Sequence, residues 1–148
     1  MYRIGIKGSV ILGQLLARNH LLQFVNLADN GLSQESLFYI VEGLKYNPEL
    51  ISLNLSQNDL GAGSLSYSPF GTLLGIFEPS RDNPEFISCK SLEEIVISSN
   101  QLTNKHIEDL AYWIKQSAKN KIKRIDLANN KLSVKGVLVL FQALRANL

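Results

Sequence analysis

One eleven-residue pattern recurs four times in this sequence and constrains its fold more than any other feature. The pattern is Leu-x-x-Leu-x-Leu-x-x-Asn-x-Leu, with Ile or Val replacing Leu at some apolar positions, and it covers residues 22–32, 50–60, 92–102 and 122–132. A pattern repeated at such spacing indicates a solenoid, in which each unit buries its apolar face against the next one. We therefore expect one continuous stack of repeats.

The spacing between the copies indicates what each repeat contains. The first two copies begin 28 residues apart and the last two 30 residues apart, which leaves room for a strand, a turn and a helix of about a dozen residues. Apolar residues at positions i, i+3, i+4 and i+7 predict buried helix faces at 37–44, 107–114 and 137–144. Counting back one 28-residue period places another helix at 8–20.

The interval between the second and third copies is 42 residues, which is longer than one plain repeat. The apolar helix set reappears there at 70–77, but it begins twelve residues after Asn58 instead of seven. Insertions within 61–69 and 78–90 account for the whole difference, so the interval is one decorated repeat. Long loops in a regular array are usually functional or disordered.

A unit of this length with this pattern resembles the ribonuclease-inhibitor-like subfamily of leucine-rich repeat proteins. The resemblance implies an α/β fold: a right-handed β/α horseshoe solenoid with parallel strands on the concave side, helices on the convex side, and a function in binding proteins. It covers one domain, 1–148, with repeats at 22–49, 50–91, 92–121 and 122–148 and a partial repeat at 1–21. No polar capping repeat is visible, so we expect a fragment of a longer array, or a protomer that covers its ends by association.

The apolar positions and the asparagine of the pattern have structural roles. The first position of each copy points inward, so Leu22, Leu50, Leu92 and Ile122 are expected to form one column of the core. The asparagine turns the chain away from the strand while its amide bonds main-chain groups of its own and the neighbouring repeat, because a buried polar group needs partners. This structural role is expected of Asn30, Asn58, Asn100 and Asn130.

The third, fifth and seventh positions of each copy point outward from the sheet and form the expected concave face. The seventh position is small in every repeat, which relieves crowding or leaves a smooth floor for a partner. An exposed aromatic residue is typical of binding hot spots, which makes Phe24 the best single contact. The candidate partner-binding residues of this face are Phe24, Asn26, Ser52, Asn54, Glu94, Val96, Arg124 and Asp126.

The concave face is too small to be a whole binding surface. Four strands with three outward residues each offer only twelve positions, whereas a standard interface uses roughly 20–30 residues a side. The inserted loops at 61–69 and 78–90 are expected to supply further contacts, through Tyr67, Arg81 and Phe86.

The sequence offers almost no catalytic chemistry. The two histidines, His20 and His106, have no cysteine or carboxylate at metal-ligand spacing. Gly61-Ala62-Gly63-Ser64 lacks the lysine of a phosphate-binding loop and fits a turn better. Glu93 and Glu94 are adjacent on a strand and so point to opposite sides. We therefore expect no enzyme activity, no metal and no cofactor.

The single cysteine, Cys89, allows no internal disulfide and points to a reducing compartment. The cytoplasm fits this, as does a host cytosol if the chain is a secreted bacterial effector. No apolar stretch is long enough to span a membrane. Residues 101–148 hold nine Lys and Arg against three Asp and Glu, but without interleaved aromatic residues or a nucleic-acid motif we expect no nucleic acid partner.

Three functional hypotheses follow. The leading one is a non-enzymatic module that binds a partner protein through the concave face and the inserted loops. The first alternative is a GTPase-activating regulator resembling the Ran activator, which would present a polar rim residue such as Asn129, Arg124 or Arg81 to a nucleotide; fold analogy alone does not establish it. The second is a structural segment that self-associates through its uncapped ends.

Overall fold

The computed structural model describes residues 3–62, 71, 91–116 and 121–146. The loop residues Tyr67, Arg81 and Phe86 lie outside the described residues, as does the expected helix at 70–77 apart from Gly71. The helices are α1 (Gly5–Arg18), α2 (Gln34–Leu44), α4 (Asn104–Gln116) and α5 (Val134–Arg145), and the strands are β1 (Phe24–Asn26), β2 (Ser52–Asn54), β3 (Glu94–Val96) and β4 (Arg124–Asp126).

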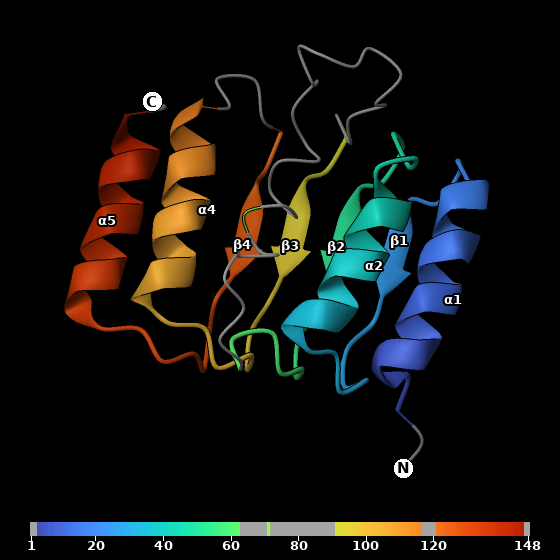
Figure 1. Cartoon of the computed structure of the whole chain (residues 1–148). Helices are drawn as coiled ribbons and strands as arrows, with labels where there is room; N and C mark the ends of the chain where they lie inside the picture. Colours follow the sequence, from blue (N-terminus) through green and yellow to red (C-terminus); the bar gives the residue numbers. More distant parts are fainter. Residues whose placement is uncertain (1–2, 63–70, 72–90, 117–120, 147–148) are drawn as a thin grey trace.

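The four strands form one parallel sheet in chain order, β1-β2-β3-β4. Equivalent positions of the pattern lie side by side, so that Val25 pairs with Leu53, Leu53 with Ile95, and Ile95 with Ile125. Figure 1 shows the described helices together on one side of this sheet. The fold is therefore α/β with a parallel sheet, and the sheet has one face without helices, which we call the open face.

Burial alternates along β1, β2 and β3 as the pattern requires. The central residue of each strand points toward the helices, and Leu53 and Ile95 are almost completely buried. The residues on either side of them are half-buried on β2 and β3, and Phe24 and Asn26 are exposed on β1. This alternation confirms that the third and fifth positions of the pattern lie on the open face.

Two of the three expected helix faces are buried as the periodicity indicated. Leu37, Ile40, Val41 and Leu44 of α2 are each no more than 1% exposed, and Ile107, Leu110, Ala111 and Ile114 of α4 are also buried. The helix expected at 8–20 is present as α1, which begins three residues earlier and ends two earlier.

The burial predicted for the third helix face, at 137–144, is largely wrong. Helix α5 forms, but Val137, Phe141 and Leu144 are 40%, 65% and 44% exposed. The reason is that α5 packs on α4 through another face, on which Gly136 and Ala143 are buried. Leu140, the fourth residue of the predicted set, is partly buried against the core, whereas no described element covers Val137, Phe141 and Leu144.

The expected core column is complete only in its middle. Leu50 and Leu92 are buried, whereas Leu22 and Ile122 are only partly buried against the core. A residue in a stack is shielded by the repeats on both sides, and the first and fourth strands have a neighbouring strand on one side only.

A left-handed residue turns the chain after each strand. Asp29, Gln57, Ser99 and Asn129, at the eighth position of the four copies, have φ angles of 55–56°. Asparagine and aspartate tolerate this conformation better than other non-glycine residues. The repeated turn directs each chain segment from the sheet toward the helix layer.

The asparagine at the ninth position follows this turn and ties neighbouring repeats together. Asn58 Nδ2 donates to Leu27 O of the preceding repeat and to Leu55 O of its own, each at 2.9 Å. Asn100 donates to Leu55 O and Asn130 to Ile97 O in the same manner. Asn58, Asn100 and Asn130 therefore make the bonds expected within and between repeats, whereas the described bond of the Asn30 side chain, to Ala28 O, stays within its own repeat.

Candidate protein-binding face

The parallel register arranges the outward side chains of the open face in rows that cross the sheet. Phe24, Ser52, Glu94 and Arg124 form the first row, and Asn26, Asn54, Val96 and Asp126 form the second. All eight residues expected from the sequence to lie on this face do so. Seven of the eight, all except Asp126, line one hollow together with Val25.

Three residues of the first row form a continuous polar chain. Ser52 Oγ donates to Glu94 Oε2 at 2.7 Å, and Arg124 Nη1 donates to Glu94 Oε1. Arg124 Nη2 also lies 3.5 Å from Asp126 Oδ2. The bond from Ser52 and the bond and charge of Arg124 lower the pKa of the Glu94 carboxyl below its usual value. Glu94 is therefore anionic at neutral pH and fixed between two strands.

The second row is ordered by its own backbone. The side-chain Oδ1 atoms of Asn26, Asn54 and Asp126 each accept from the main-chain N–H two residues later, at 3.0 Å. Such local bonds hold the side chain in one orientation. Within the described part of the chain, the Nδ2 groups of Asn26 and Asn54 donate to no acceptor. These two amides are available to main-chain carbonyls of a partner.

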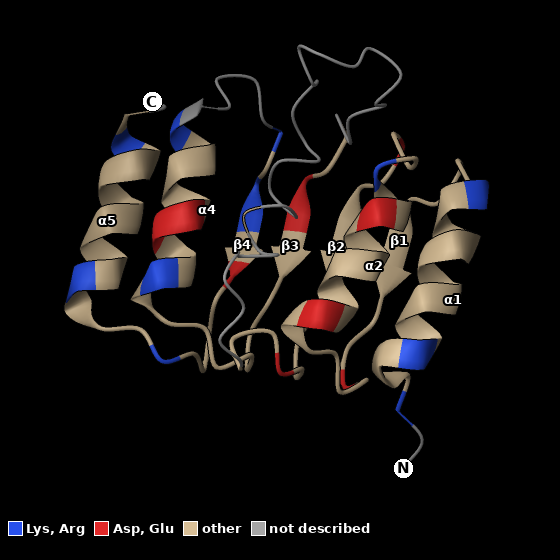
Figure 2. Ribbon diagram, in the orientation of Figure 1, with Lys and Arg blue, Asp and Glu red and all other residues tan. Residues whose placement is uncertain are grey.

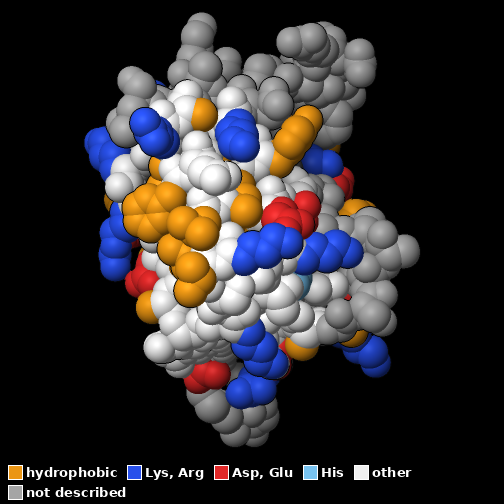
Figure 3. Space-filling view, turned by 90° about the vertical axis from the view of Figure 1, so that its left-hand side faces the viewer, with side chains coloured by type: hydrophobic (Ala, Val, Ile, Leu, Met, Phe, Trp, Pro, Cys, Tyr) orange, Lys and Arg blue, Asp and Glu red, His pale blue; other side chains and the backbone are white. Residues whose placement is uncertain are grey.

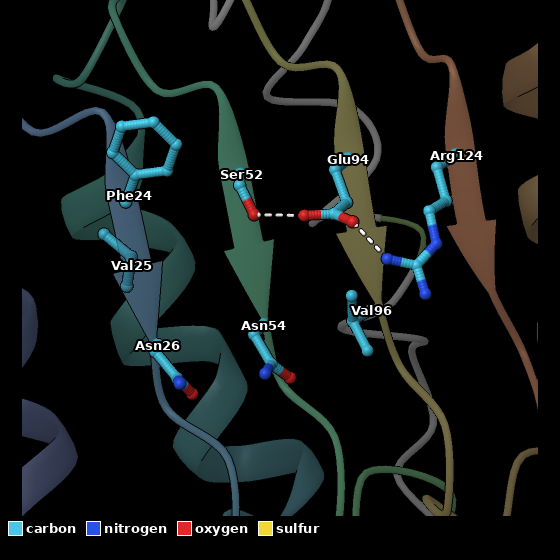
Figure 4. Close-up of a pocket in the computed structure, with 8 residues that line it drawn as sticks. All are labelled: Phe24, Val25, Asn26, Ser52, Asn54, Glu94, Val96 and Arg124. Atoms are coloured by element: carbon cyan, nitrogen blue, oxygen red, sulfur yellow. Dashed lines mark hydrogen bonds and ion pairs between the residues drawn. The ribbon is translucent and has the colours of Figure 1, made fainter.

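The two rows enclose an open hollow of about 420 Å³. Figure 4 shows Phe24 at one side, the chain of Ser52, Glu94 and Arg124 across the sheet, and Asn26 and Asn54 below. The ring of Phe24 is 69% exposed, although an aromatic ring of this size is usually buried in a core. The hollow therefore combines one apolar surface with fixed polar groups. It is lined by Phe24, Val25, Asn26, Ser52, Asn54, Glu94, Val96 and Arg124.

The floor beyond the second row is flat because its side chains are small. Ala28, Ser56, Ser98 and Ala128 occupy the seventh position of the four copies. Ser56 is only 7% exposed and donates to Asn54 Oδ1 at 2.8 Å. Because these side chains are small, they offer few further contacts to a partner on the open face.

Sequence reasoning located the residues of this face but missed how they are connected. It treated Glu94, Arg124 and Asp126 as separate anchors, whereas the structure joins them with Ser52 in one network. It also missed Val25, whose position in the pattern points inward but which lines the hollow. The signal for the network was present: in-register strands place a Glu beside an Arg at the third position of adjacent copies.

Within the described residues, no three His, Cys, Asp or Glu side chains come together as a metal site would require. The helices that the structure describes are each too short or too polar to cross a membrane. The basic residues Lys105, Lys115, Lys121 and Lys135 are exposed, and Lys119 lies outside the described residues. Figure 2 shows basic residues at both ends of α4 and of α5.

No protein-family model matches the chain. Human Protein NLRC5, which contains leucine-rich repeats, is 26% identical over 133 residues, a segment that covers 83% of this chain but 7% of NLRC5. The likeness agrees with leucine-rich repeats in this sequence. The chain spans a small part of that relative.

Two solved structures share the fold. The leiomodin-1 actin-binding site 2 has a TM-score of 0.64 at 15% sequence identity, covering 98% of this chain and 78% of its own. The tropomodulin C-terminal domain of Caenorhabditis elegans has a TM-score of 0.66 at 16% identity, covering 99% and 84%. At these identities the similarity concerns the fold alone.

Proposed function

We propose that this chain is part of a leucine-rich repeat array of the ribonuclease-inhibitor-like type, a right-handed β/α horseshoe whose concave side is the open face. In this proposal it is a non-enzymatic module that binds a partner protein in a reducing compartment such as the cytoplasm. The single cysteine supports the compartment. The parallel sheet with helices on one side supports the architecture.

The observation that carries the proposal is the exposed ring of Phe24 beside an already ordered polar network. An aromatic side chain at the centre of a contact contributes strongly to binding. Side chains that are fixed before a partner arrives lose little conformational freedom on binding, which raises affinity. The bonds of Ser52, Glu94, Asn26 and Asn54 meet this condition.

The partner contacts extend beyond the open face in this proposal. Its two rows present eight side chains, which is fewer than the roughly 20–30 residues of a standard interface. The loops 61–69 and 78–90, with Tyr67, Arg81 and Phe86, belong to the repeat that contributes Ser52 and Asn54. We assign them the remaining contacts on their place in the sequence.

Affinity capture from the source cells tests the proposal. The Phe24→Ala, Arg124→Ala double variant should lose partners that the unchanged protein recovers. Tyr112→Ala is the matched control, because Tyr112 is an aromatic residue on helix α4 that is 67% exposed, similar to Phe24. Equal recovery of the same partners by all three proteins would refute binding through the open face.

Actin is a rational first partner to test, because the structurally similar leiomodin-1 segment is an actin-binding site. Co-sedimentation with filamentous actin and gel filtration with monomeric actin would separate the two forms of that partner. The same double variant and the Tyr112→Ala control apply. Unchanged binding by the double variant would place an actin contact outside the open face.

The two alternatives are less well supported. A GTPase-activating role requires a polar side chain at the rim that can reach a nucleotide. Arg124 is engaged by Glu94 and Asp126, and Arg81 lies outside the described residues. Asn129, which is exposed in the left-handed turn after β4, is the rim residue that remains for this alternative. Self-association end to end would bring α1, which carries Lys7 and Arg18, against the basic unit around α5. Like charges oppose that contact.

A further inference from the structure

Two side-chain amides on the open face carry donors that the protein itself does not use. The Oδ1 atoms of Asn26 and Asn54 each accept from the main-chain N–H two residues later, at 3.0 Å. A main-chain N–H can only donate, so it holds the oxygen of each amide toward the backbone and leaves the nitrogen toward solvent. Within the part of the chain that the structure describes, neither Nδ2 group has an acceptor. The face therefore presents two oriented donors, on neighbouring strands in Figure 4.

The position of these amides in the stack keeps them accessible. Asn54 lies on β2, which has β1 and β3 on either side, and Asn26 lies beside it on β1. A further strand beside β1 or β4 would extend the sheet sideways and leave its open face uncovered. The exposed apolar side chains at the α5 end of the molecule (Figure 3) differ in this respect, because a following repeat of a longer array would cover them.

The charges around the two amides disfavour an anionic occupant. The outward positions of the four strands hold three charged residues, Glu94, Arg124 and Asp126, which sum to one negative charge. At the rim after β1, Asp29 pairs with Arg3 and adds no net charge. A carboxylate of a partner would be repelled by the excess negative charge, whereas a main-chain carbonyl accepts the same hydrogen bonds without carrying a charge. The acceptor that fits the two amides is therefore a main-chain carbonyl.

The spacing of the amides indicates which carbonyls they can reach. Asn26 and Asn54 are register partners on adjacent strands, which lie about 4.8 Å apart. Carbonyls on one side of an extended segment recur at intervals of about 6.8 Å. The last turn of a helix leaves four carbonyls without partners in the helix, and these lie about 3–5 Å apart around its axis. A helix end can therefore meet both amides at once, which an extended segment cannot.

We propose that the open face binds the C-terminal end of a helix of the partner protein, with Asn26 and Asn54 donating to its last carbonyls. This inference rests on the protein-binding role proposed above and names the chemistry of that partner. The exposed ring of Phe24, on the same face of β1 as Asn26, covers an apolar side chain of the last helical turn. The helix end carries a charge of about −0.5, which is less than that of a carboxylate, and Arg124 lines the same hollow.

An NMR titration of the isotope-labelled protein tests the proposal. The probe is a lactam-bridged helical peptide of alanines with one leucine in its last turn and a C-terminal amide, which leaves the last carbonyls unpaired. The control peptide continues into Gly-Leu, a Schellman ending whose main-chain N–H groups satisfy those carbonyls. We expect the side-chain amide resonances of Asn26 and Asn54 to shift with the first peptide. The control peptide should bind at least about tenfold more weakly.

Exchanging the two donors for acceptors makes the test specific. Asn26→Asp with Asn54→Asp keeps the oxygen that accepts from the backbone, and the fold accommodates this change because Asp126 makes the same bond on β4, at 3.0 Å. The double variant should bind the first peptide at least about tenfold more weakly, since two donors become acceptors that face carbonyls. Asp126→Asn is the matched control. It makes the reverse exchange at the equivalent position and should not weaken binding.

Each other occupant gives a result that overturns the proposal. Tighter binding by the aspartate double variant would indicate a basic occupant, and unchanged binding would exclude the two amides. Equal binding of the two peptides would exclude the carbonyls of a helix end. Sodium acetate that shifts the same resonances at a lower concentration than the peptide would assign the amides to a carboxylate. The same shifts on concentrating the protein alone would assign them to a second copy of the chain.

Affinity capture separates this inference from the proposed function. Partners that are lost by the Phe24→Ala, Arg124→Ala variant but retained by the Asn26→Asp, Asn54→Asp variant would overturn recognition of a helix end and leave binding through the open face intact. Partners that both double variants retain would refute the open face as a binding surface.

Discussion

The side chain of Asn58 accepts a hydrogen bond from the main-chain N–H of Asn30, 28 residues earlier, at 3.0 Å. The same Oδ1 atom accepts from Leu32 N at 3.0 Å. The relation recurs between Asn130 and Asn100, again at 3.0 Å. Asn58, Asn100 and Asn130 each bond the turn of the repeat before them, and the repeats are held in register by these bonds as well as by apolar contact.

Replacing Asn58 with leucine should destabilise the fold strongly. The change keeps the volume but leaves the N–H groups of Asn30 and Leu32 and the carbonyl of Leu27 without their partner in a buried place. Each such group costs about 1–3 kcal/mol, so we expect a loss of about 3 kcal/mol or more in the free energy of unfolding. Urea denaturation followed by circular dichroism measures it.

Asn30→Leu is the matched control for that experiment. The Asn30 carboxamide makes one described bond, to Ala28 O, and the residue is only partly buried. We expect a loss near 1 kcal/mol. Similar losses for the two variants would contradict the role of the asparagine as a link between repeats.

The position of a repeat in the stack should set the cost of removing its core leucine. Leu50 is completely buried, so Leu50→Ala should cost about 2–5 kcal/mol of unfolding free energy. Leu22 occupies the same pattern position but is only partly buried, and Leu22→Ala should cost clearly less. Chemical denaturation of both variants compares them; an equal cost would show that burial at the first strand is greater than the structure indicates.

The features that could be predicted from the sequence are those that one repeat determines by itself. The apolar period gave the buried faces of α2 and α4, since the apolar residues of those helices belong to the core. The register of the pattern placed Phe24, Ser52, Glu94 and Arg124 in one row, because parallel strands of equal pattern align. The inward asparagines followed from the need to satisfy a buried amide.

The features that were missed depend on neighbours. The period of α5 is as regular as that of α4, yet Val137, Phe141 and Leu144 are exposed, because periodicity indicates which side of a helix is apolar and not whether anything covers it. In the same way, the pattern places Glu94 and Arg124 on one face but does not give the rotamers that join them to Ser52. Contacts across repeats require the three-dimensional arrangement.

Helices α1 and α2 approach so closely at Gly13 that a side chain there should destabilise the fold. A Cβ atom on Gly13 would lie 2.2 Å from the main-chain oxygen of Tyr39, and one on Gly43 would lie 2.2 Å from Gly13 O. The obstructing atoms belong to the backbone, so the helices themselves would have to separate. We expect Gly13→Ala to cost about 1–3 kcal/mol as an overpacked contact.

Thermal unfolding followed by circular dichroism measures the Gly13→Ala effect. Alanine favours a helix over glycine by about 1 kcal/mol, so propensity alone would stabilise the variant. The two effects have opposite signs. A variant as stable as the unchanged protein, or more stable, would contradict the close contact of α1 with α2.

The Ser52 hydroxyl should control the ionisation of Glu94. Its hydrogen bond is the largest cause of the lowered pKa of the Glu94 carboxyl, ahead of Arg124. Ser52→Ala should therefore raise that pKa toward the usual value, while Ser52→Thr, which keeps a hydroxyl, should change it little. Carboxyl chemical shifts measured by NMR across the acid range report the pKa. If the pKa of the Glu94 carboxyl is the same in Ser52→Ala as in the unchanged protein, Arg124 and not Ser52 lowers it.

His106 has a capping role at the start of α4. Its Nδ1 accepts from the main-chain N–H of Thr103 at 3.0 Å, and its Nε2 lies 3.3 Å from the side-chain amide of Gln34. The imidazole is 9% exposed. Burial is the first cause of its lowered pKa, with Asp109 acting in the opposite direction and Lys105 in the same one. Protonation of Nδ1 would also remove the lone pair that accepts the hydrogen bond from the main-chain N–H of Thr103.

Stability should therefore fall as the solution is acidified through the ordinary pKa of histidine. The pKa of His106 is lowered in the folded state, so on acidification the unfolded chain binds a proton before the folded protein does. The contribution of His106 to stability is therefore present above the usual pKa of 6.5 and is lost as the pH falls below it. The urea midpoint measured between about pH 8 and about pH 5 should decrease in this window. His106→Asn keeps an acceptor for Thr103 without a titrating ring, so its midpoint should vary less over the same window. A decrease of equal size in that variant would exclude His106 as the cause.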